Sequence, residues 1–378
     1  MDGAAARAAA ARQRRPALRR PRARAAARAL AGAPLRAERV TAARLDPIDH
    51  LLALDPGRRG IDRFFVAGGA AAAARALAGS RRVLIATGFC VPPGLPETDG
   101  PPGAAVLGRA LRRLGADVRY VTDAPVVAPL AAALGAMDEP ADVDVFDGDA
   151  AALLSRERPT HLVAIERPGR ARSGDYLSAR GESIARWNAA IDDLFVLAGG
   201  AGRASRAASG ARRTSRGSRP VAGPAGRQRP DPPRGVRSAV RGSAGAAPTA
   251  GAPDTASPRR PRATTIAVGD GGNEIGMGNV HARLARMSPL MGTIASVVRV
   301  DHLVVAGTSN WGAYGVVAAL ERLARRPLLH TPADERRLVE ACVKAGAVDG
   351  IVRHREPTVD GLPLDVHAAV VELLRLAV

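Results

Sequence analysis

Continuous apolar runs alternate with segments of helical periodicity along most of the chain. The apolar runs predict strands over 81–89, 117–123, 142–147, 160–167, 264–270 and 295–307. The helical spacing predicts helices over 103–116, 125–135, 149–157, 183–198, 311–326, 332–345 and 365–376, after a helical lead-in over 46–78. Because strands without polar alternation are buried on both faces, we expect a doubly wound α/β fold, with a mostly parallel sheet and helices on both faces.

Two basic segments interrupt this pattern. Residues 1–45 carry twelve arginines and two acids, and residues 199–263 carry fourteen arginines and two aspartates. Neither segment contains Phe, Trp or Tyr, so neither can bury enough apolar surface to offset the entropy of ordering the chain. We predict that both are disordered. The chain would then hold a single domain in two parts, 46–198 and 264–378, separated by a disordered insert.

The formal net charge of +19 belongs to these two segments, and the rest of the chain is slightly acidic. Proteins that read nucleic acids usually add aromatic platforms or a groove-reading element to their basic residues. Neither is evident here, so we expect no specific binding of nucleic acid. Arginine replaces lysine everywhere except at Lys344, which is typical of a GC-rich gene. In such a gene, out-of-frame translation is an alternative origin of residues 199–263, and an early start codon is an alternative origin of residues 1–45.

Other features of the composition narrow the class of protein. No apolar run reaches the roughly 18 residues that span a bilayer, so we expect no membrane segment. Cys90 and Cys342 have neither metal-ligand nor disulfide-framework spacing, which is typical of a reducing cytoplasm. The histidines show no HExxH pattern and no serine stands in a nucleophile elbow, so neither a zinc site nor a serine hydrolase is indicated. A homo-oligomer stays open.

In doubly wound sheets, ligands bind at the carboxyl ends of the strands. The residues that follow the predicted strands are polar and rich in glycine, which favours a small-molecule site there. The candidates for substrate contact are Thr87, Gly88, Asp99, Arg167, Gly271, Gly272, Asn273, Asn310 and Lys344. The alternative for Asn310 is capping of the helix that starts near Trp311, although Ser309 suits that role better. For Lys344 the alternative is chance survival of one lysine.

The stretch TTIAVGDGGNEIGMGN, residues 264–279, combines glycines with Asp270 and Glu274. Glycine-rich turns often bind phosphate, but two acids would repel it, and no Walker lysine follows. Flexible backbone with carboxylates suits a divalent cation or an ammonium group better. The N–H groups of Gly271 and Gly272 would then be left for an anionic end of the substrate. The alternative is a tight turn with solvated acids.

Further acids follow other predicted strands. Glu97 and Asp99 stand two apart in a loop rich in proline and glycine. Glu166 closes an apolar strand, where an acid is costly unless it is used, although Arg167 and Arg170 could neutralise it. We expect these acids at one edge of the sheet, where a shared cation would offset their mutual repulsion. Oxygen ligands favour Mg²⁺ or Mn²⁺ over zinc.

Six motifs stand in an order that characterises one protein family. They are TGFCVPPGLPETDGPPGA, AIERPGRARSGDY, IDDLF, GDGGNEIGMGNV, TSNWGAY and KAGAVDGIVRHREPTVDGL. On these motifs the chain resembles the D-glutamate cyclase C-terminal domain family, over residues 46–198 and 264–378. The resemblance implies an α/β fold and a carbon–oxygen lyase that converts D-glutamate, or a similar amino acid, to 5-oxo-D-proline with loss of water.

The implied chemistry is compatible with the residues. Lactam formation needs a deprotonated amine, an electrophilic γ-carboxyl and an oxygen that leaves as water, so a carboxylate base and a divalent cation would both serve. The catalytic candidates are Glu97, Glu166 and Glu274, with Glu166 or Glu97 as the base. The metal candidates are Asp270, Glu274 and Asp99. The N–H groups of Gly271 and Gly272, with Asn310, would hold the α-carboxylate.

Three departures from the family keep other functions open. Ser173 and Ser178 stand where the family usually has Asp and Asn, and residues 199–263 replace a short link. Better-known members also carry an N-terminal domain that resembles a hydro-lyase, which this sequence does not show. The alternatives are a metal-dependent phosphatase or other small-molecule hydrolase that uses the same carboxylates, and a degenerate, non-enzymatic paralogue.

Overall fold

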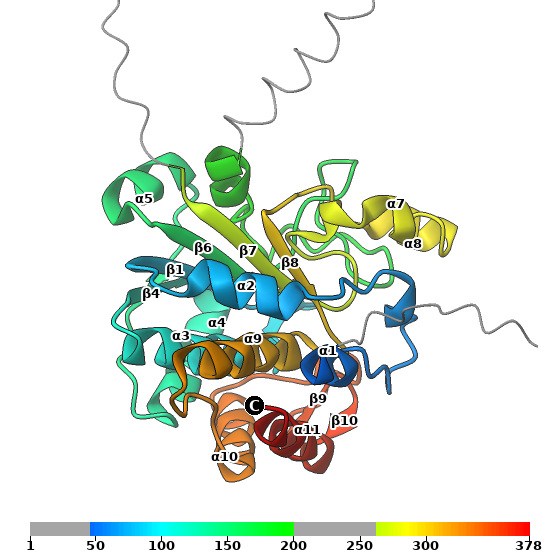
Figure 1. Cartoon of the computed structure of the whole chain (residues 1–378). Coiled ribbons are helices and arrows are strands. Elements are labelled where there is room, and N and C mark those ends of the chain that lie inside the picture. Colours follow the sequence, from blue (N-terminus) through cyan, green and yellow to red (C-terminus); the bar gives the residue numbers. More distant parts are fainter. Residues whose placement is uncertain (1–45, 200–261) are drawn as a thin grey trace, which may run out of the picture. The chain divides into compact units, whose positions relative to one another are not determined.

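A computed structural model describes residues 46–199 and 262–378 of the chain (Figure 1). The predicted disorder of 1–45 and of most of 199–263 therefore lies outside the described residues. The two described stretches form one compact unit. β6 (His161–Ile165) and β7 (Thr264–Gly269), which flank the gap, pair side by side in one sheet. The prediction of a single domain interrupted by an insert is confirmed.

In the described part of the chain, six parallel strands form the central sheet. Their order is β5 (Val143–Val145), β4 (Asp117–Thr122), β1 (Arg82–Thr87), β6, β7 and β8 (His302–Val305). The chain starts in the middle at β1, moves outward through β4 to β5, and returns to build β6, β7 and β8 on the other side. This is the order of a doubly wound sheet, so the predicted fold class is confirmed.

The strands are buried on both faces, as their uninterrupted apolar sequences require. Along β1, Val83 and Ile85 belong to the core on one face, and Leu84 and Ala86 belong to the core on the other. β6 alternates in the same way. Because successive side chains point to opposite faces, a strand with two buried faces needs apolar residues at nearly every position.

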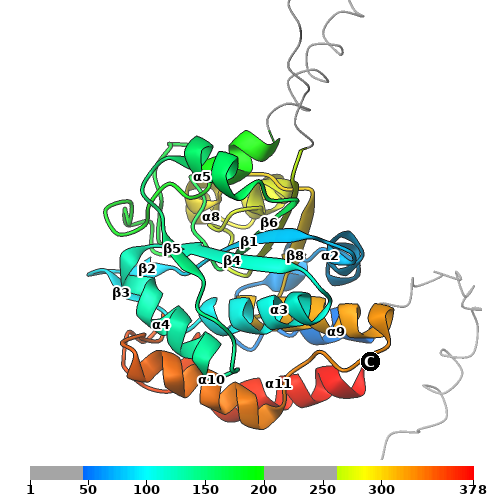
Figure 2. The same cartoon turned by 90° about the vertical axis from the view of Figure 1, so that its left-hand side faces the viewer.

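Helices cover the two faces to unequal depth (Figure 2). One face carries α1 (Pro47–Leu52), α2 (Gly69–Leu77), α3 (Pro101–Arg113), α4 (Ala124–Gly135) and α9 (Ser309–Ala324), with α10 (Pro332–Lys344) and α11 (Leu364–Leu376) outermost. The other face carries η1 (Ile61–Arg63), α5 (Ala150–Glu157), residues 193–199, η2 (Met277–Asn279), α7 (His281–Leu284) and α8 (Pro289–Ile294). No helix of the described stretches is both long and apolar enough to cross a membrane.

Helix α9 carries its N-terminus to the carboxyl edge of the sheet. Thr308 is the N-cap, and its hydroxyl accepts a hydrogen bond from the N–H of Trp311 at 3.2 Å. Ser309, the expected cap, is instead the first helical residue. Gly312 lets the helix approach β7 closely, because an added Cβ would lie 2.4 Å from a methyl of Val268. The first turn of α9 is therefore fixed against the ends of the strands.

Two predicted elements differ from the structure. Only His302–Val305 of the predicted strand 295–307 is β-strand, because Ser296 and Val297 give their N–H groups to the loops after β7 and β6 instead. Of the predicted helix 183–198, only the part from 193 is helical. Buried Asn188 holds the preceding residues in an irregular path through bonds to the backbone of Cys90. In both segments, tertiary hydrogen bonds override the local apolar pattern.

Two short hairpins of the described residues were not predicted. They are β2 (Cys90–Val91) with β3 (Leu95–Pro96), and β9 (Thr358–Val359) with β10 (Leu362–Pro363). The turn of the second hairpin consists of Asp360 and Gly361, which have φ values of 55° and 75°. Two residues with positive φ are what a type I′ hairpin turn requires, and Asp-Gly is a preferred sequence for it. This turn brings Asp360 to the site described below.

Candidate active site

A cavity of about 350 Å³ lies at the carboxyl edge of the sheet, beside the loops after β1, β6 and β7. β1 and β6 are the neighbours at which the strand order reverses, which is where doubly wound sheets bind ligands. Carboxylates line the cavity, namely Glu97, Glu166, Asp270, Glu274 and Asp360. Arginines line it as well, namely Arg59, Arg180 and Arg353. The cavity is therefore dominated by charged groups of both signs.

Glu166 directly follows β6 and is 6% exposed. Its backbone has φ +43°, a left-handed conformation that strains any residue except glycine. Its carboxylate accepts a hydrogen bond of 2.6 Å from the hydroxyl of Ser309. Neither Arg167 nor Arg170 pairs with it, since both bind other aspartates. A strained, buried acid without a paired cation is typical of a functional position.

Glu97 enters the cavity from the loop after β3. It is 7% exposed, and its Oε1 has no hydrogen-bond partner in the structure. The other oxygen lies against Gly350, where an added Cβ would come within 2.2 Å of it. Glycine at 350 therefore makes room for the Glu97 carboxyl group. An unpaired buried carboxyl is costly unless a ligand or a proton satisfies it.

Arg59 lines the cavity and comes from the loop before η1. With Asp270 and Asp360, which it binds, it forms the part that we call the floor of the cavity. Its Nη1 lies 2.6 Å from Oδ1 of Asp270, and its Nη2 lies 2.9 Å from Oδ1 of Asp360. The backbone N–H groups of Arg59 and Gly60 donate to Asp55 at 2.8 and 2.7 Å, which fixes the loop. The second oxygens of Asp270 and Asp360 are buried without a partner. One guanidinium thus neutralises the two aspartates only in part.

Burial raises the pKa of the acids around this floor. Coulombic repulsion among them adds to the effect, and the charge of Arg59 opposes it at Glu97, Asp270 and Asp360. The pKa of Asp360 is raised to about 7. The other acids whose pKa is raised are Glu97, Asp99, Glu166 and Asp270. So many carboxyl groups in one buried place are stable only when protons or cations accompany them.

Asp99 and Asn310 join the loop after β3 to the first turn of α9. Asp99 accepts the N–H groups of Ser309 and Asn310, each at 2.8 Å, so its charge lies at the positive end of the helix. The side-chain oxygen of Asn310 accepts the N–H groups of Gly100 and Gly103 at 3.0 and 2.8 Å. Asn310 is fully buried and does not line the cavity. Its side-chain N–H₂ group donates to the carbonyl of Thr98 at 3.2 Å, and a substrate carboxylate would have to displace that bond.

The glycine-rich loop after β7 closes around its own acid. Glu274 accepts the N–H groups of Gly271 at 2.6 Å and Gly272 at 2.7 Å, with a longer bond from Asp270. Glycine at 271 leaves room for this carboxylate, since an added Cβ would lie 2.9 Å from it. The two donors that were expected to hold an anionic substrate end are thus bonded to Glu274. Asn273 lines the cavity and donates to the carbonyl of Leu177 at 2.7 Å.

Other predicted site residues lie outside the cavity lining. Thr87 donates its hydroxyl to the carbonyl of Ile165 at 2.8 Å. Arg167 is fully buried; it forms an ion pair with Asp123 and donates to the carbonyl of Gly88 at 3.0 Å. These three residues, Thr87, Gly88 and Arg167, hold the ends of β1 and β6 together. Lys344 is exposed at the end of α10.

Sequence reasoning missed Arg59, Asp360 and the rim arginines Arg180 and Arg353. The signal for Asp360 was the Asp-Gly pair, which predicts a hairpin turn but not its position in space. Arg59 follows no strand, so the rule that ligands bind where strands end could not find it. Its proximity to Asp270 depends on the path of the lead-in segment, which the hydrophobic pattern does not specify.

Two groups of three acids are close enough to hold one cation. Oxygens of Asp99, Asp270 and Asp360 lie within 4.8 Å of one another, and so do oxygens of Glu166, Asp270 and Glu274. Asp270 belongs to both groups, and its unpartnered Oδ2 is available to a ligand. Carboxylate oxygens are the ligands that Mg²⁺ and Mn²⁺ prefer. The donor set therefore fits the expected divalent cation.

Of the two serines that replace usual family residues, one reaches the cavity. Ser178 lines it and is 6% exposed, and its hydroxyl oxygen accepts the N–H groups of Arg180 and Glu182, both at 3.2 Å. Ser173 is exposed and lies outside the lining. The change at 178 is thus the one with direct access to a ligand.

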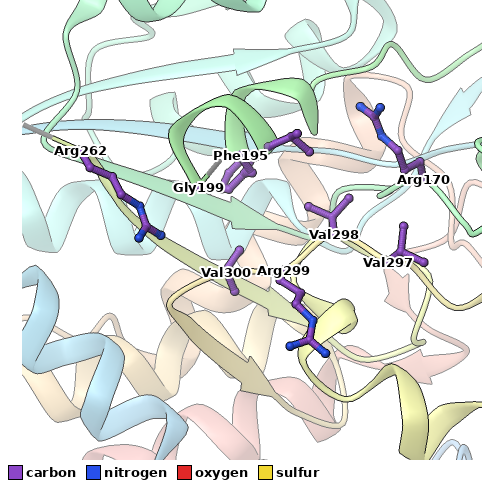
Figure 3. Close-up of a pocket in the computed structure, with 9 residues that line it drawn as sticks. Arg170, Phe195, Gly199, Arg262, Val297, Val298, Arg299 and Val300 are labelled. Atoms are coloured by element: carbon purple, nitrogen blue, oxygen red, sulfur yellow. The ribbon is translucent and has the colours of Figure 1, made fainter. Parts of the chain in front are cut away.

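A second cavity of about 240 Å³ shares no lining residue with the first (Figure 3). It is lined by Arg170, Arg262, Arg299 and a run of valines. Figure 3 shows that Arg170 and Arg299 point away from each other. Arg170 is bound to Asp192 and Arg262 to Asp301. Because these cations do not converge, the cavity does not form an anion site.

Two comparisons relate the chain to known proteins. A family model described as "D-glutamate cyclase-like, C-terminal" matches residues 48–211 and 252–375. The chain is also similar to mitochondrial D-glutamate cyclase of Homo sapiens, with 29% identity over 294 residues. The similar region covers 72% of this chain and 38% of the human protein. The chain therefore spans well under half the length of that relative.

Proposed function

The chain belongs to the D-glutamate cyclase-like C-terminal family, and on that basis we propose that it is a lyase that converts D-glutamate to 5-oxo-D-proline. The observation that carries the proposal is the presence of two buried carboxyl groups, Glu97 and Glu166, in one charged cavity, neither of them in an ion pair within the described residues. The family supports the class of enzyme, and the cavity supports the chemistry of an acidic amino acid.

The charge distribution of the cavity complements such a substrate. D-Glutamate carries one ammonium group and two carboxylates. The acids of the cavity, among them Asp270 and Glu166, suit the ammonium group. Arg180 is exposed and Arg353 is half-buried at the lining, so both can meet a carboxylate with a forked pair of donors. Apolar residues such as Phe89 and Met291 line the walls and suit the methylene groups.

The reaction transfers two protons from the nitrogen of the substrate to one of its oxygens, with no net uptake or release of protons. The ammonium group of the substrate loses two protons, the nitrogen forms a bond to the γ-carbon, and one γ-oxygen takes both protons and leaves as water. Glu166 and Glu97 are proposed as the groups that carry these protons, one as base and one as acid. Burial raises the pKa of both carboxyls, so each is a stronger base when deprotonated than an exposed glutamate is, as a group that takes a proton from nitrogen and passes it to a leaving oxygen needs to be.

Ser309 is proposed to fix the position of Glu166. Its hydroxyl donates to one oxygen of Glu166, which lines the cavity, and the other oxygen is proposed to act on the substrate. Asp99 holds the N–H of the same serine, which anchors the contact to the first turn of α9. The proton-transfer group is thus fixed by a rigid helix rather than by a mobile loop, as positioned catalysis requires.

A divalent cation, Mg²⁺ or Mn²⁺, is part of the proposal. The acids that would hold it are Asp270 with either Asp99 or Glu274, and when bound it would polarise the γ-carboxyl group. The unpartnered Oδ2 of Asp270 supports such a ligand. The cytoplasmic location and the homo-oligomer stay predictions.

The direct test is product analysis. Purified full-length chain is incubated with D-glutamate or L-glutamate, with Mn²⁺ and separately with EDTA, and the products are separated by chiral chromatography. We expect 5-oxo-D-proline from D-glutamate and little product from the L-enantiomer. Folded protein that forms no oxoproline above the buffer control would refute the cyclase function. Phosphate release from a panel of phosphate esters would instead favour the hydrolase alternative.

The matched control is Glu166→Gln. Glutamine keeps the size of the side chain and can accept the bond from Ser309, but it cannot carry a proton. Product formation that persists in this variant at the wild-type rate would move the reaction to another site or to a contaminant.

A further inference from the structure

Three aspartates from three separate loops meet at the cavity, and two of them, Asp270 and Asp360, line it. Asp99 follows β3, Asp270 follows β7, and Asp360 occupies the turn between β9 and β10. Oxygens of all three lie within 4.8 Å of one another. The Asp270 carboxyl is also within hydrogen-bond range of the carboxyls of both Asp99 and Asp360. Like charges at this separation repel, so the arrangement needs something to hold it together.

Apart from one another's carboxyl groups, two carboxylate oxygens at this place have no hydrogen-bond partner among the described residues. Asp270 is 3% exposed and its Oδ2 accepts no hydrogen bond. The Asp360 side chain is 10% exposed, and its Oδ2 is also unpartnered. Buried polar atoms in folded proteins are nearly always satisfied, so two neighbouring exceptions indicate a missing ligand. Because both atoms are acceptors, the ligand must be a cation or a proton donor.

Arg59 supplies part of the missing charge. Its planar guanidinium holds Oδ1 of Asp270 and Oδ1 of Asp360 with two different nitrogens, so both carboxylates are fixed relative to each other. The single positive charge of Arg59 leaves three aspartates undercompensated. The arrangement has the form of a preorganised ion site with one internal counter-ion.

From this geometry we propose that Asp99, Asp270 and Asp360 bind one divalent cation, Mg²⁺ or Mn²⁺, and that Arg59 competes with it for the same carboxylates. The inference rests on the proposed function, because it assigns to that pocket the cation that the cyclisation would use. It also selects between the two groups of acids. The group with Glu166 and Glu274 has Asp270 as its one member with an unpartnered buried oxygen, and Glu274 already accepts N–H bonds through both oxygens.

The chemistry of the site determines which ions fit. All side-chain ligands are oxygens, which favours hard cations over zinc or copper. Asp99 can join the site because its Oδ2 accepts one hydrogen bond and keeps a lone pair. The short aspartate side chains come from a loop that is bonded to the first turn of α9, from the loop after β7 and from a tight hairpin turn, which restricts the site and favours small ions over Ca²⁺.

The test measures Mn²⁺ binding to the full chain without substrate, after dialysis against a chelator, by electron paramagnetic resonance of free Mn²⁺ and by calorimetry. We expect one bound ion per chain. Asp360→Asn should weaken binding at least tenfold, whereas Asp365→Asn, which changes an aspartate that is 86% exposed, should shift it less than twofold. Arg59→Gln should tighten binding by about tenfold, because it removes the competing charge, and Arg180→Gln on the rim should change it little.

Several outcomes would overturn the inference. One is the absence of bound Mn²⁺ from both the wild type and Arg59→Gln, since the variant tests the site even where the wild-type site is closed by the arginine. Another is wild-type affinity in Asp360→Asn. A third is a larger loss in Glu274→Gln than in Asp360→Asn, which would favour the other group. Circular dichroism and the Tm in EDTA show whether each variant is folded.

These measurements separate the inference from the proposed reaction. Bound Mn²⁺ without any cyclase activity would refute the reaction and leave the cation site standing. Cyclase activity that is unaffected by EDTA, in a chain that binds no Mn²⁺, would refute the cation site and leave the reaction standing.

Discussion

Two arginines lie at the carboxyl edge of the same sheet and have opposite surroundings. Arg167 is fully buried beside Asp123, and its guanidinium also donates to two backbone carbonyls, of Gly88 and Ala189. The second oxygen of Asp123 accepts the N–H of Ala189 at 2.9 Å. The Asp123 carboxylate is therefore satisfied through both oxygens.

Arg59 also bridges buried acids, but it leaves one oxygen of Asp270 and one of Asp360 without a partner. The difference teaches how to distinguish the roles of buried charges in this protein. Where both oxygens of the carboxylate are satisfied, as at Asp123 beside Arg167, the ion pair holds loops together, although the Nε of Arg167 has no hydrogen-bond partner among the described residues. Where carboxylate oxygens have no hydrogen-bond donor, as beside Arg59, the site can bind a ligand. Four predictions test this distinction.

The largest effect is expected from Arg167→Met. The variant leaves Asp123 charged and buried without its partner, which costs about 3–5 kcal/mol of unfolding free energy. Arg59→Met should cost about 1 kcal/mol or less in EDTA at pH 5, because its aspartates can take up protons instead. Urea unfolding of both variants measures the difference. Equal losses would mean that the two arginines do not differ in role.

Glu166→Gln is expected to lower the rate of cyclisation by about 10²–10⁴-fold, since it removes a proton-transfer group. Its Tm should be unchanged or higher, because a neutral amide replaces a buried, strained acid. Steady-state kinetics and thermal unfolding are measured on the same preparation. If the variant loses stability in parallel with its rate, Glu166 has a structural role, like Arg167, rather than a role in proton transfer.

The stability of the chelated protein should depend on pH. Burial raises the pKa of Asp360 from 3.8 to about 7 in the folded chain. The folded state therefore binds more protons than the unfolded state between these values. This contribution is complete below about pH 4 and is lost as the pH rises through 7. We expect a fall of unfolding free energy on the order of 1–3 kcal/mol between pH 5 and pH 8.

The control for this pH dependence is Asp360→Asn, which should flatten the curve, whereas Asp365→Asn should not. Saturating Mn²⁺ should also flatten it, because the cation replaces the protons. A wild-type curve that rises from pH 5 to pH 8 in EDTA would contradict the assignment of these acids as undercompensated.

The smallest effect is expected at the rim. Arg180→Gln should raise KM for D-glutamate by roughly five- to tenfold, about 1 kcal/mol, with kcat little changed, because the residue would bind a carboxylate before and during the reaction. Arg299→Gln, an exposed arginine of the second cavity, serves as the control and should leave KM unchanged. A loss in kcat alone would place Arg180 in the chemical step.

Much of the fold could be predicted from the sequence. The strands β1, β4, β6 and β7 lie within a residue or two of their predicted bounds, because each is an apolar run with turn residues at its end. The predictions for 183–198 and 295–307 were partly wrong. Side chains such as Asn188 and backbone groups of distant loops determine those paths, and a periodic pattern carries no record of such partners.

The sequence also predicted only some residues of the candidate site. Acids that directly follow strands, such as Glu166 and Asp270, could be found because parallel strands bring their carboxyl ends to one edge. Arg59 and Asp360 could not, since neither follows a strand of the central sheet. Asn310 and Gly272 were found but have bonds within the protein that only the folded chain reveals.

By itself, the sequence determined the layers of the fold, the edge at which chemistry is placed, and the acidic character of that edge. Those features depend on local periodicity and on residue type. Only the tertiary structure decided which charges are satisfied and which are not. That distinction depends on distances between segments far apart in the chain: Arg59 to Asp270, Arg167 to Asp123, and Ser309 to Glu166. Electrostatic and hydrogen-bond energies change steeply over an ångström, so the identity of the residues alone cannot show which charges are satisfied.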